Sequence, residues 1–297
     1  MRNIVVTGGS GLVGSRLKKY IPDAKYISSK DYDLTKEDDV YRMFLELNPS
    51  IIIHLAAKVG GIIDNINKPE EYLYDNVMMN TLLVKYSYKF NVDRFIGILS
   101  TCIYPDVYDR YPMIEDDLHK GEPTKTNFSY GYAKRMMATH IDSCNQQYNT
   151  KFNYLIPCNL YGIGDKTGTN SHYVTALLDK IKISNENNHN CIELYGDGTP
   201  IRQFMYVDDL CEIIKYIIDN KIYDSFNVAP DEIYTIDEIA KIAIDIINSN
   251  IEIKYNKEMP NGQYRKDVSN SKLRSIIKDF KFTSLEDGIK KTYFIND

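Results

Sequence analysis

Two side chains that can act on a carbonyl compound follow one predicted strand. Ser100 and Cys102 come directly after the apolar run RFIGIL, which is typical of a buried strand. In an extended chain, residues two apart point to the same side, so the hydroxyl and the thiol are expected to enter one site. The simpler alternative is a small buried thiol, because free cysteine is among the most buried residue types.

A second reactive pair lies in the segment YGYAK, where Tyr130 and Lys134 are four residues apart. On a helix these two side chains share a face, and a nearby ammonium is expected to lower the pKa of the phenol from about 10 toward neutrality. Such a tyrosine can exchange a proton with a carbonyl oxygen. In a chain with 25 tyrosines, however, this spacing also arises by chance.

The segment GGSGLVG, residues 8–14, lies between a predicted strand and a predicted helix. Its glycines let the backbone approach a pyrophosphate, and the helix N-terminus stabilises negative charge, so this context predicts a dinucleotide site. At the end of the next predicted strand, the hydroxyl of Ser29 and the ammonium of Lys30 suit a 2′-phosphate and favour NADP(H). Asp31 is a competing acid that would suit NAD.

The overall composition excludes several classes of protein. The 297 residues are 43% hydrophobic and 26% charged, and a net charge of −5 provides no electrostatic attraction for nucleic acid. The five cysteines form no CxxC pair, which indicates free thiols in a reducing compartment, and they share no zinc-ligand spacing with the five histidines. With no signal-peptide pattern and no apolar run that could span a bilayer, we expect a cytoplasmic protein without membrane contact or metal.

Predicted strands and helices alternate along the first half of the chain. This alternation predicts the α/β class, with a Rossmann-type, doubly wound parallel sheet. The weaker pattern after Tyr161 predicts a smaller, discontinuous C-terminal lobe over the carboxyl ends of the strands, where ligands bind. The expected NADP-binding domain comprises residues 1–161 and about 203–230, and the substrate-binding lobe comprises residues 162–202 and 231–297.

The glycine loop, Ser100, Tyr130 and Lys134 follow one another in the order typical of the short-chain dehydrogenase/reductase superfamily. The segments PCNLYG (157–162) and IRQFMYVDDL (201–210) resemble its extended branch, which binds nucleotide sugars in the C-terminal lobe. Within that branch, the chain resembles the GDP-L-fucose synthase family almost from end to end. The segments that carry this resemblance are AAKVGGI (56–62), STCIYP (100–105), EPT (122–124), NSHYVTALL (170–178), GDGTPIRQF (196–204) and NGQYRK (261–266).

The resemblance implies two reactions in one site. Members of this family invert C3 and C5 of GDP-4-keto-6-deoxymannose and then reduce C4 with a hydride from NADPH. Protons next to a ketone are acidic, and inversion needs a base on one side of the centre and an acid on the other. By resemblance, Cys102 is this base and His172 is this acid. The resemblance also implies that Ser100 and Tyr130 hold the ketone oxygen and that Lys134 belongs to the catalytic residues.

The resemblance also assigns binding residues. Those expected at the cofactor are Gly8, Ser10, Gly11, Leu12, Val13, Gly14, Ser29, Lys30, Leu55, Ala56, Ala57, Lys134, Pro157, Asn159 and Leu160. Those expected at the nucleotide sugar are Asn159, Asn170, His172, Lys180, Tyr195, Arg202 and Arg265. The charge of the three cations in this second set also suits a diphosphate.

Other functions remain open from the sequence. A reductase that acts only at C4 of a related nucleotide-linked 4-keto-6-deoxy sugar or heptose would leave Cys102 and His172 without a role. A non-catalytic NADP-binding regulator would be expected to lack Tyr130 or Lys134, and both are present. A sugar-nucleotide dehydratase typically carries an acid–base carboxylate pair near that tyrosine, where this chain has Thr101 and Cys102.

The quaternary structure is predicted from two long helical patterns, at residues 70–90 and 130–149, which carry apolar residues all round. In the extended branch such helices pair across a two-fold axis as a four-helix bundle. The resemblance therefore implies a homodimer.

Overall fold

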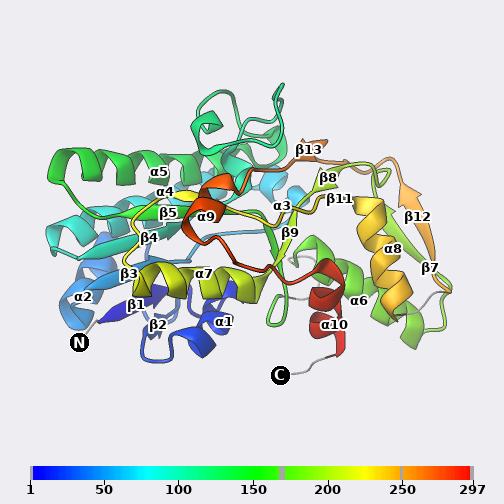
Figure 1. Ribbon diagram of the computed structural model, residues 1–297, viewed down its shortest axis with the longest axis horizontal. Helices are drawn as coiled ribbons and strands as arrows, with labels where there is room; N and C mark the ends of the chain where they lie inside the picture. Colours follow the sequence, from blue (N-terminus) through cyan, green and yellow to red (C-terminus); the bar gives the residue numbers. More distant parts are fainter. Residues whose placement is uncertain (1–2, 167–170, 248–249, 295–297) are drawn as a thin grey trace.

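The computed structural model describes residues 3–166, 171–247 and 250–294, and its larger part is built on one central sheet (Figure 1). The strands of this sheet are β1 (Ile4–Thr7), β2 (Lys25–Ile27), β3 (Ile51–His54), β4 (Arg94–Ile98), β5 (Asn153–Pro157) and β10 (Phe226–Val228). They all run parallel in the order β10-β5-β4-β3-β1-β2, which confirms the predicted sheet. The strand order reverses at β1 and β3, and ligands bind at the carboxyl ends of strands beside such a point.

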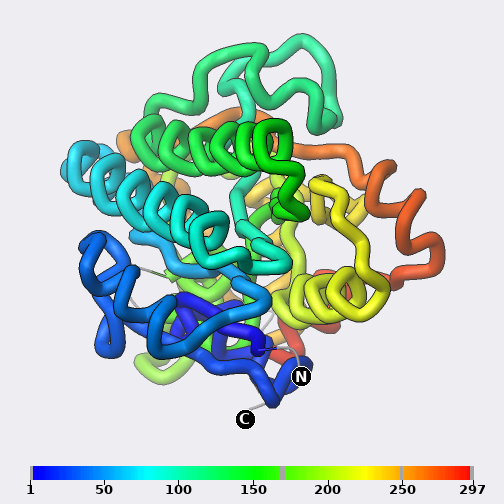
Figure 2. Tube along the Cα trace, turned by 90° about the vertical axis from the view of Figure 1, so that its left-hand side faces the viewer, coloured from blue at the N-terminus to red at the C-terminus, as the bar shows by residue number. Residues whose placement is uncertain are grey.

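Helices cover both faces of this sheet. They are α1 (Leu12–Tyr20), α2 (Glu37–Leu47), α4 (Pro69–Lys89), α5 (Phe128–Tyr148) and α7 (Val207–Asp219). Helix α1 packs against α7 on one face, while α2 packs against α4 on the other, and Figure 2 shows α4 and α5 side by side. The sequence of α2 shows why such helices form: it buries Val40, Met43, Phe44 and Leu47, whose spacing follows one helical face.

The smaller part of the molecule, on the right of Figure 1, contains short strand pairs and three helices within the described residues. The helices are α6 (Tyr173–Glu186), α8 (Ile236–Ile247) and α10 (Leu285–Phe294). The strands are β6 (Asn159–Tyr161), β7 (Cys191–Tyr195), β8 (Ile201–Arg202), β9 (Phe204–Tyr206), β11 (Tyr234–Thr235), β12 (Glu252–Asn256) and β13 (Arg265–Lys266). Strand β6 pairs with β9, β7 pairs with β12, and β8 lies between β11 and β13.

One segment departs from the strand expected on sequence. The run FNYLIPCNLYG is divided into β5, in the central sheet, and β6, which pairs with β9 at the start of the smaller part. The break falls at Cys158, directly after Pro157. Because proline has no N–H to donate to a strand ladder, Pro157 favours the end of β5.

The described residues form two hydrophobic cores. The larger core combines the central sheet and its helices with Val268, Leu273 and Ile277, which bring α9 (Ser271–Ile276) against β10. The smaller core joins α6, α8 and α10 to β7 and β9. This pairing of cores supports two domains, but residues 268–277 pack in the larger core although the predicted division gives them to the smaller lobe. The division itself stays a prediction.

Shorter elements complete the described chain. They are α3 (Ile62–Asn67) and three 3-10 turns, η1 (Thr101–Ile103), η2 (Glu115–Asp117) and η3 (Lys125–Asn127). Among the helices of the described residues, none is long and apolar enough to cross a membrane.

Candidate active site

The glycine turn after β1 is shaped by close backbone contacts. Gly8 has φ +71°, and a Cβ there would lie 2.7 Å from the backbone nitrogen of Ala56 in the loop after β3. A Cβ on Gly14 would lie 2.4 Å from the carbonyl oxygen of Gly8. Only glycine allows both approaches, which bring the N-terminus of α1 onto the turn. Its first N–H groups have no partner within the helix, so the turn fits a pyrophosphate.

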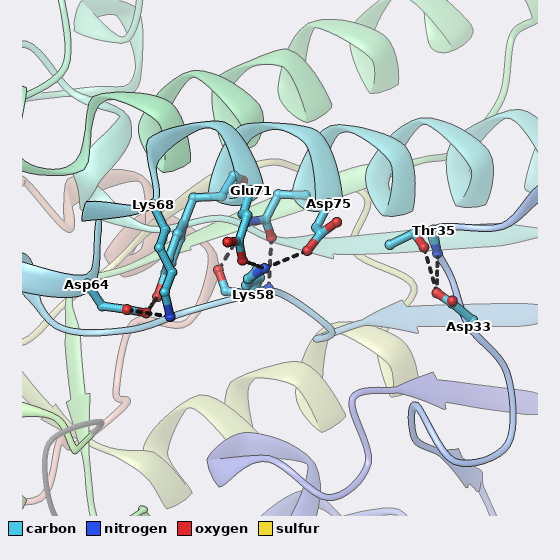
Figure 3. A network of polar contacts seen from close by, with 9 residues as sticks. Asp33, Thr35, Lys58, Asp64, Lys68, Glu71 and Asp75 are labelled. Carbon is cyan, nitrogen blue, oxygen red and sulfur yellow. Dashed lines mark hydrogen bonds and ion pairs between the residues drawn. The ribbon is translucent and has the colours of Figure 1, made fainter. Parts of the chain in front are cut away.

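The loop after β3, which holds Leu55, Ala56 and Ala57, is fastened to α4 by a polar network (Figure 3). The Lys58 ammonium donates to Glu71 at 2.6 Å and to Asp75 at 2.8 Å. Hydrogen bonds to these two carboxylates raise the pKa of Lys58. The loop expected to line the cofactor is therefore held by α4, and Ala56 within it lies against the glycine turn.

The turn after β2 bears on the choice between NADP and NAD. The Asp31 carboxylate accepts hydrogen bonds from the backbone N–H of Ser28 at 2.8 Å and from its hydroxyl at 2.9 Å. These bonds lower the pKa of Asp31 and engage the carboxylate within its own turn. Ser29 and Lys30 are exposed beside it. The competing acid is thus occupied locally, which favours the 2′-phosphate interpretation.

A buried hydrogen-bond chain connects the cofactor side with α5. His54, at the end of β3, contacts the Thr7 hydroxyl through Nδ1 at 2.8 Å and Asn80 Oδ1 through Nε2 at 3.0 Å. Asn80 in turn donates to the carbonyl of Ala133 at 3.1 Å. Burial lowers the pKa of His54 to about 3, so its ring is neutral at physiological pH. These hydrogen bonds connect α5, which carries Tyr130 and Lys134, with the end of β1.

Ser100 and Cys102 lie together at the end of β4, but not for the reason expected on sequence. The chain does not stay extended: Ser100 caps the 3-10 turn η1, and its hydroxyl oxygen accepts the N–H of Cys102 at 3.3 Å. A Cβ on Gly131 would lie 2.8 Å from the Cys102 carbonyl oxygen, so glycine at this position lets α5 approach the turn closely. Tyr130 is thereby brought beside Cys102.

The prediction that Lys134 lowers the pKa of the Tyr130 phenol is wrong in this structure. The Lys134 ammonium lies 6.0 Å from the ring centroid of Tyr130 and donates to the carbonyl of Ile98 at 2.8 Å. Burial raises the pKa of Tyr130, and the nearby charge of Cys102 raises it further. Burial also lowers the pKa of Lys134 to about 7. Desolvation is the largest cause of both shifts, so Tyr130 is a neutral phenol that can donate a proton.

The Cys102 sulfur accepts two donors that the sequence did not single out. Asn127 Nδ2 lies 3.2 Å from it, and Lys266 Nζ lies 3.4 Å from it. Burial opposes ionisation of this thiol, but the charge of Lys266 and hydrogen bonds from Ser100 and Lys266 prevail, so the pKa of Cys102 is lowered. The surroundings therefore ease ionisation of the thiol that the resemblance assigns as the base.

His172, at the N-terminal end of α6, has a carboxylate partner of its own. Its Nδ1 lies 2.8 Å from Asp165 Oδ1, and the Thr175 hydroxyl donates to Asp165 Oδ2 at 2.6 Å. Burial disfavours the Asp165 carboxylate, but hydrogen bonds from His172 and Thr175 lower its pKa overall. With Nδ1 held by Asp165, Nε2 is the ring nitrogen left for a substrate.

The remaining candidates occupy the smaller part of the molecule. Lys180 donates to the Glu193 carbonyl at 2.6 Å and lies 5.2 Å from the ring centroid of the exposed Tyr195, so these two candidates are neighbours. The Arg202 guanidinium contacts backbone carbonyls between β8 and the 263–264 segment. Arg265 forms an ion pair with Asp267 at 2.6 Å.

Asn159 and Asn170 are the two asparagines expected at the nucleotide sugar. Asn159, at the start of β6, donates from Nδ2 to the Gln203 carbonyl at 2.8 Å, so its amide also ties β6 to the strand beside it. Asn170 lies outside the described residues. No group of three or more potential metal ligands occurs in the described ranges.

Sequence reasoning missed Asn127, Asp165 and Lys266. Asn127 stands three residues before Tyr130, a spacing that could have suggested one helical face. Lys266 ends the segment NGQYRK, in which only Arg265 was selected. Asp165 lies in a loop without periodicity, so no pattern indicated its contact with His172.

Comparison with known proteins agrees with this geometry. The family described as NAD dependent epimerase/dehydratase matches residues 4–229, so the chain belongs to this family. It is 32% identical to "GDP-L-fucose synthase" of Dictyostelium discoideum over 100% of this chain and 96% of that protein. It is 34% identical to "GDP-L-colitose synthase" of Yersinia pseudotuberculosis over 99% of this chain and 98% of that protein.

Solved structures give the same result. The crystal structure of a GDP-L-fucose synthetase from Naegleria fowleri bound to NADP superimposes with a TM-score of 0.88. That chain is 30% identical, and the match covers 99% of this chain and 92% of the other. The resemblance predicted from the sequence is thereby confirmed.

Proposed function

We propose that this protein is an NADPH-dependent epimerase and reductase of the GDP-L-fucose synthase type. It inverts C3 and C5 of GDP-4-keto-6-deoxymannose and reduces C4. The observation that carries the proposal is the assembly at the end of β4, where the hydroxyl of Ser100 accepts the N–H of Cys102 and the neutral phenol of Tyr130 interacts electrostatically with the same cysteine. A simple reductase needs the hydroxyl and the phenol, but it has no use for a thiol with a lowered pKa.

Inversion begins with removal of a proton from a carbon beside the ketone. The Cys102 thiolate takes this proton and becomes a thiol, and the electron pair of the C–H bond moves into the enolate. Hydrogen bonds from Ser100 and Tyr130 to the ketone oxygen stabilise that charge. His172 then gives a proton to the opposite face of the carbon. Two such rounds invert the two centres.

Reduction uses the same hydrogen bonds. NADPH, when bound in the cradle of Gly8 and Gly14, supplies the hydride for C4. Tyr130 gives its proton to the ketone oxygen, and burial suits the phenol to that role because it keeps the proton on the oxygen at neutral pH. Ser29 and Lys30 are proposed to bind the 2′-phosphate, together with the other cofactor residues expected from the sequence.

The nucleotide end is proposed to lie across the smaller lobe. Tyr195 offers an exposed ring for the base, with Lys180 beside it. Arg202 and Arg265 come from paired strands, β8 and β13, and supply positive charge for the diphosphate. Asn159 and His172 are proposed to contact the sugar.

The proposed function is tested by following NADPH oxidation with GDP-4-keto-6-deoxymannose in D₂O and examining the product by NMR. We expect one NADPH oxidised per product, with deuterium at C3 and C5 of a fucose-configured sugar. Deuterium should enter because both returned protons derive from solvent. Absence of NADPH oxidation would overturn the proposal.

A reductase that acts only at C4 of a related nucleotide-linked sugar is the second candidate. It is favoured by the similarity to a solved GDP-mannoheptose C4 reductase from Campylobacter jejuni, which is 25% identical and superimposes with a TM-score of 0.86. In the same NMR experiment it predicts NADPH oxidation without deuterium at C3 and C5. Oxidation with exchange would exclude it.

The protein is further proposed to be a cytoplasmic homodimer. Its five cysteines are all free, in keeping with a reducing compartment. Helices α4 and α5 pack against each other and expose large side chains, namely Leu73, Tyr74, Tyr88, Phe128 and Tyr148. Light scattering at micromolar concentration should give twice the chain mass of 34.4 kDa, and a value of one chain mass would remove this proposal.

A further inference from the structure

Lys266 is a buried lysine whose ammonium faces the candidate base. It lies on the two-residue strand β13, and the residue is only 8% exposed. The neighbouring cation, Arg265, turns elsewhere: its guanidinium donates to both carboxylate oxygens of Asp267, at 2.6 Å and 3.1 Å. Two adjacent cations therefore have different partners, a carboxylate for Arg265 and the Cys102 sulfur for Lys266.

The surroundings of the sulfur fit an anion. A buried ammonium is costly unless an opposite charge or good acceptors surround it. Asn127 provides a second N–H donor to the same sulfur, and the Thr126 hydroxyl donates to Asn127 Oδ1 at 2.9 Å, which directs the NH₂ group toward Cys102. Two donors aimed at one sulfur suit a thiolate better than a thiol, whose own proton would need an acceptor.

The other charged and titratable groups near Cys102 do not replace Lys266. Arg202 reaches the site from β8, but its guanidinium is engaged by backbone carbonyls. Tyr130, from α5, is a phenol whose pKa burial raises. Cys158 is the other thiol near Lys266, and burial raises its pKa, so it remains neutral. Among these groups, Cys102 is the one whose sulfur accepts from the Lys266 ammonium, at 3.4 Å.

We propose that Lys266, assisted by Asn127, keeps Cys102 ionised and so prepares the base for proton abstraction. Lys266 is a positioning residue in this scheme, because it acts through the sulfur rather than on the sugar. It also favours a reset between the two inversions: once Cys102 holds a proton from C3 or C5, the adjacent ammonium promotes its release to water. The catalytic use of this thiolate rests on the proposed function, whereas the ionised thiol itself does not.

The experiment measures the pH dependence of alkylation of Cys102 by iodoacetamide in the full chain, with the Cys102 peptide quantified by mass spectrometry. The exposed thiol of Cys191 is an internal reference in every sample. In the unmodified protein we expect the midpoint for Cys102 to lie below the ordinary thiol value of about 8.5. Lys266→Met should raise that midpoint by about 1 unit or more, because it removes an opposite charge within a few ångströms. Lys266→Arg should retain most of the lowering.

The control is Lys254→Met, which removes an exposed lysine of β12 in the same lobe and should leave the midpoint unchanged. An unshifted midpoint in a folded Lys266→Met protein that still binds NADP would overturn the proposal. If Lys266→Met does not fold, the unmodified protein still decides, since equal midpoints for Cys102 and Cys191 would contradict an ionised Cys102. A rise in KM for the sugar nucleotide without a shift in midpoint would make Lys266 a substrate-binding residue instead.

Failure of the proposed function can be told apart from failure of this inference. Hydrogen exchange at C3 and C5 is followed by NMR in D₂O without NADPH, so reduction does not interfere. If the unmodified protein shows no exchange but Cys102 still titrates low and depends on Lys266, the thiolate stands and the epimerase function fails. If exchange occurs and Lys266→Met slows it by about tenfold while the midpoint rises, both stand.

Discussion

The base side and the acid side of the candidate site are built in opposite ways. Cys102 follows a strand of the central sheet and is partly buried, with donors from η3 and β13 around its sulfur. His172 begins a helix of the smaller lobe, and its side chain is 45% exposed. Each group nevertheless has a buried charged partner. The thiol contacts the cation Lys266, and the imidazole contacts the anion Asp165, whose side chain is 2% exposed.

This difference indicates how protons move in the proposed reaction. The acid gives away a proton in every inversion and must regain one, so exposure to water is useful to His172. The base must be free of its proton before each round, so a fixed cation beside Cys102 is useful there. The partner of each group is buried, and of the two groups only the acid opens widely to solvent.

Replacing the base should give the largest effect. Cys102→Ser substitutes a hydroxyl that is not ionised at neutral pH, so deuterium exchange at C3 and C5 should fall by about 10²–10⁴-fold. Binding of NADP, measured by fluorescence titration, should not change, since the glycine cradle is untouched. Cys191→Ser is the matched control at an exposed cysteine and should behave like the unmodified protein. Full exchange in Cys102→Ser would end the assignment of the base.

Replacing the acid should separate exchange from inversion. In His172→Gln, Cys102 can still take a proton, exchange it with D₂O and return deuterium to the same face. We therefore expect exchange to continue while formation of inverted product falls by about 10²-fold, as is typical when a general acid is lost. NMR of the recovered sugar distinguishes retained from inverted centres. Loss of exchange together with inversion would mean that His172 is the base, and the comparison would be reversed.

The sequence predicted these two regions unequally. Ser100, Cys102, Tyr130 and Lys134 could be predicted because they follow a short apolar run or begin a long helical pattern, and such patterns also predicted the central sheet. The contact of Lys266 with Cys102 spans 164 residues and depends on a two-residue strand, so no local pattern contains it.

Burial is the other quantity that spacing could not supply. The distance of four residues correctly put Tyr130 and Lys134 on one helix, yet the phenol pKa is raised rather than lowered, because both groups are desolvated. The paired strands β7 and β12 were missed for a related reason: they lie about 60 residues apart in the chain and interact only after the smaller lobe has formed.

The smallest effect is expected for the partner of the acid. Asp165→Asn keeps the size of the side chain but replaces the acceptor that orients His172, so inversion should slow by about tenfold, well short of the loss in His172→Gln. Thr175→Val is the matched control, since it removes the other hydrogen bond to Asp165 and leaves the carboxylate on His172. Equal rates for Asp165→Asn and the unmodified protein would show that exposure alone, without a fixed partner, suffices on the acid side.

The same substitution also carries a test in stability. The pKa of Asp165 is lower in the folded chain than the ordinary value, so its carboxylate stabilises the fold above about pH 4 and loses that contribution as pH falls through the folded pKa. Asp165→Asn has no such carboxylate, so its free energy of unfolding in urea should fall less between pH 5 and pH 3 than that of the unmodified protein. Parallel curves for the two proteins would mean that Asp165 is not held as a carboxylate by His172 and Thr175. The acid side would then lack the buried charged partner that makes it comparable with the base side.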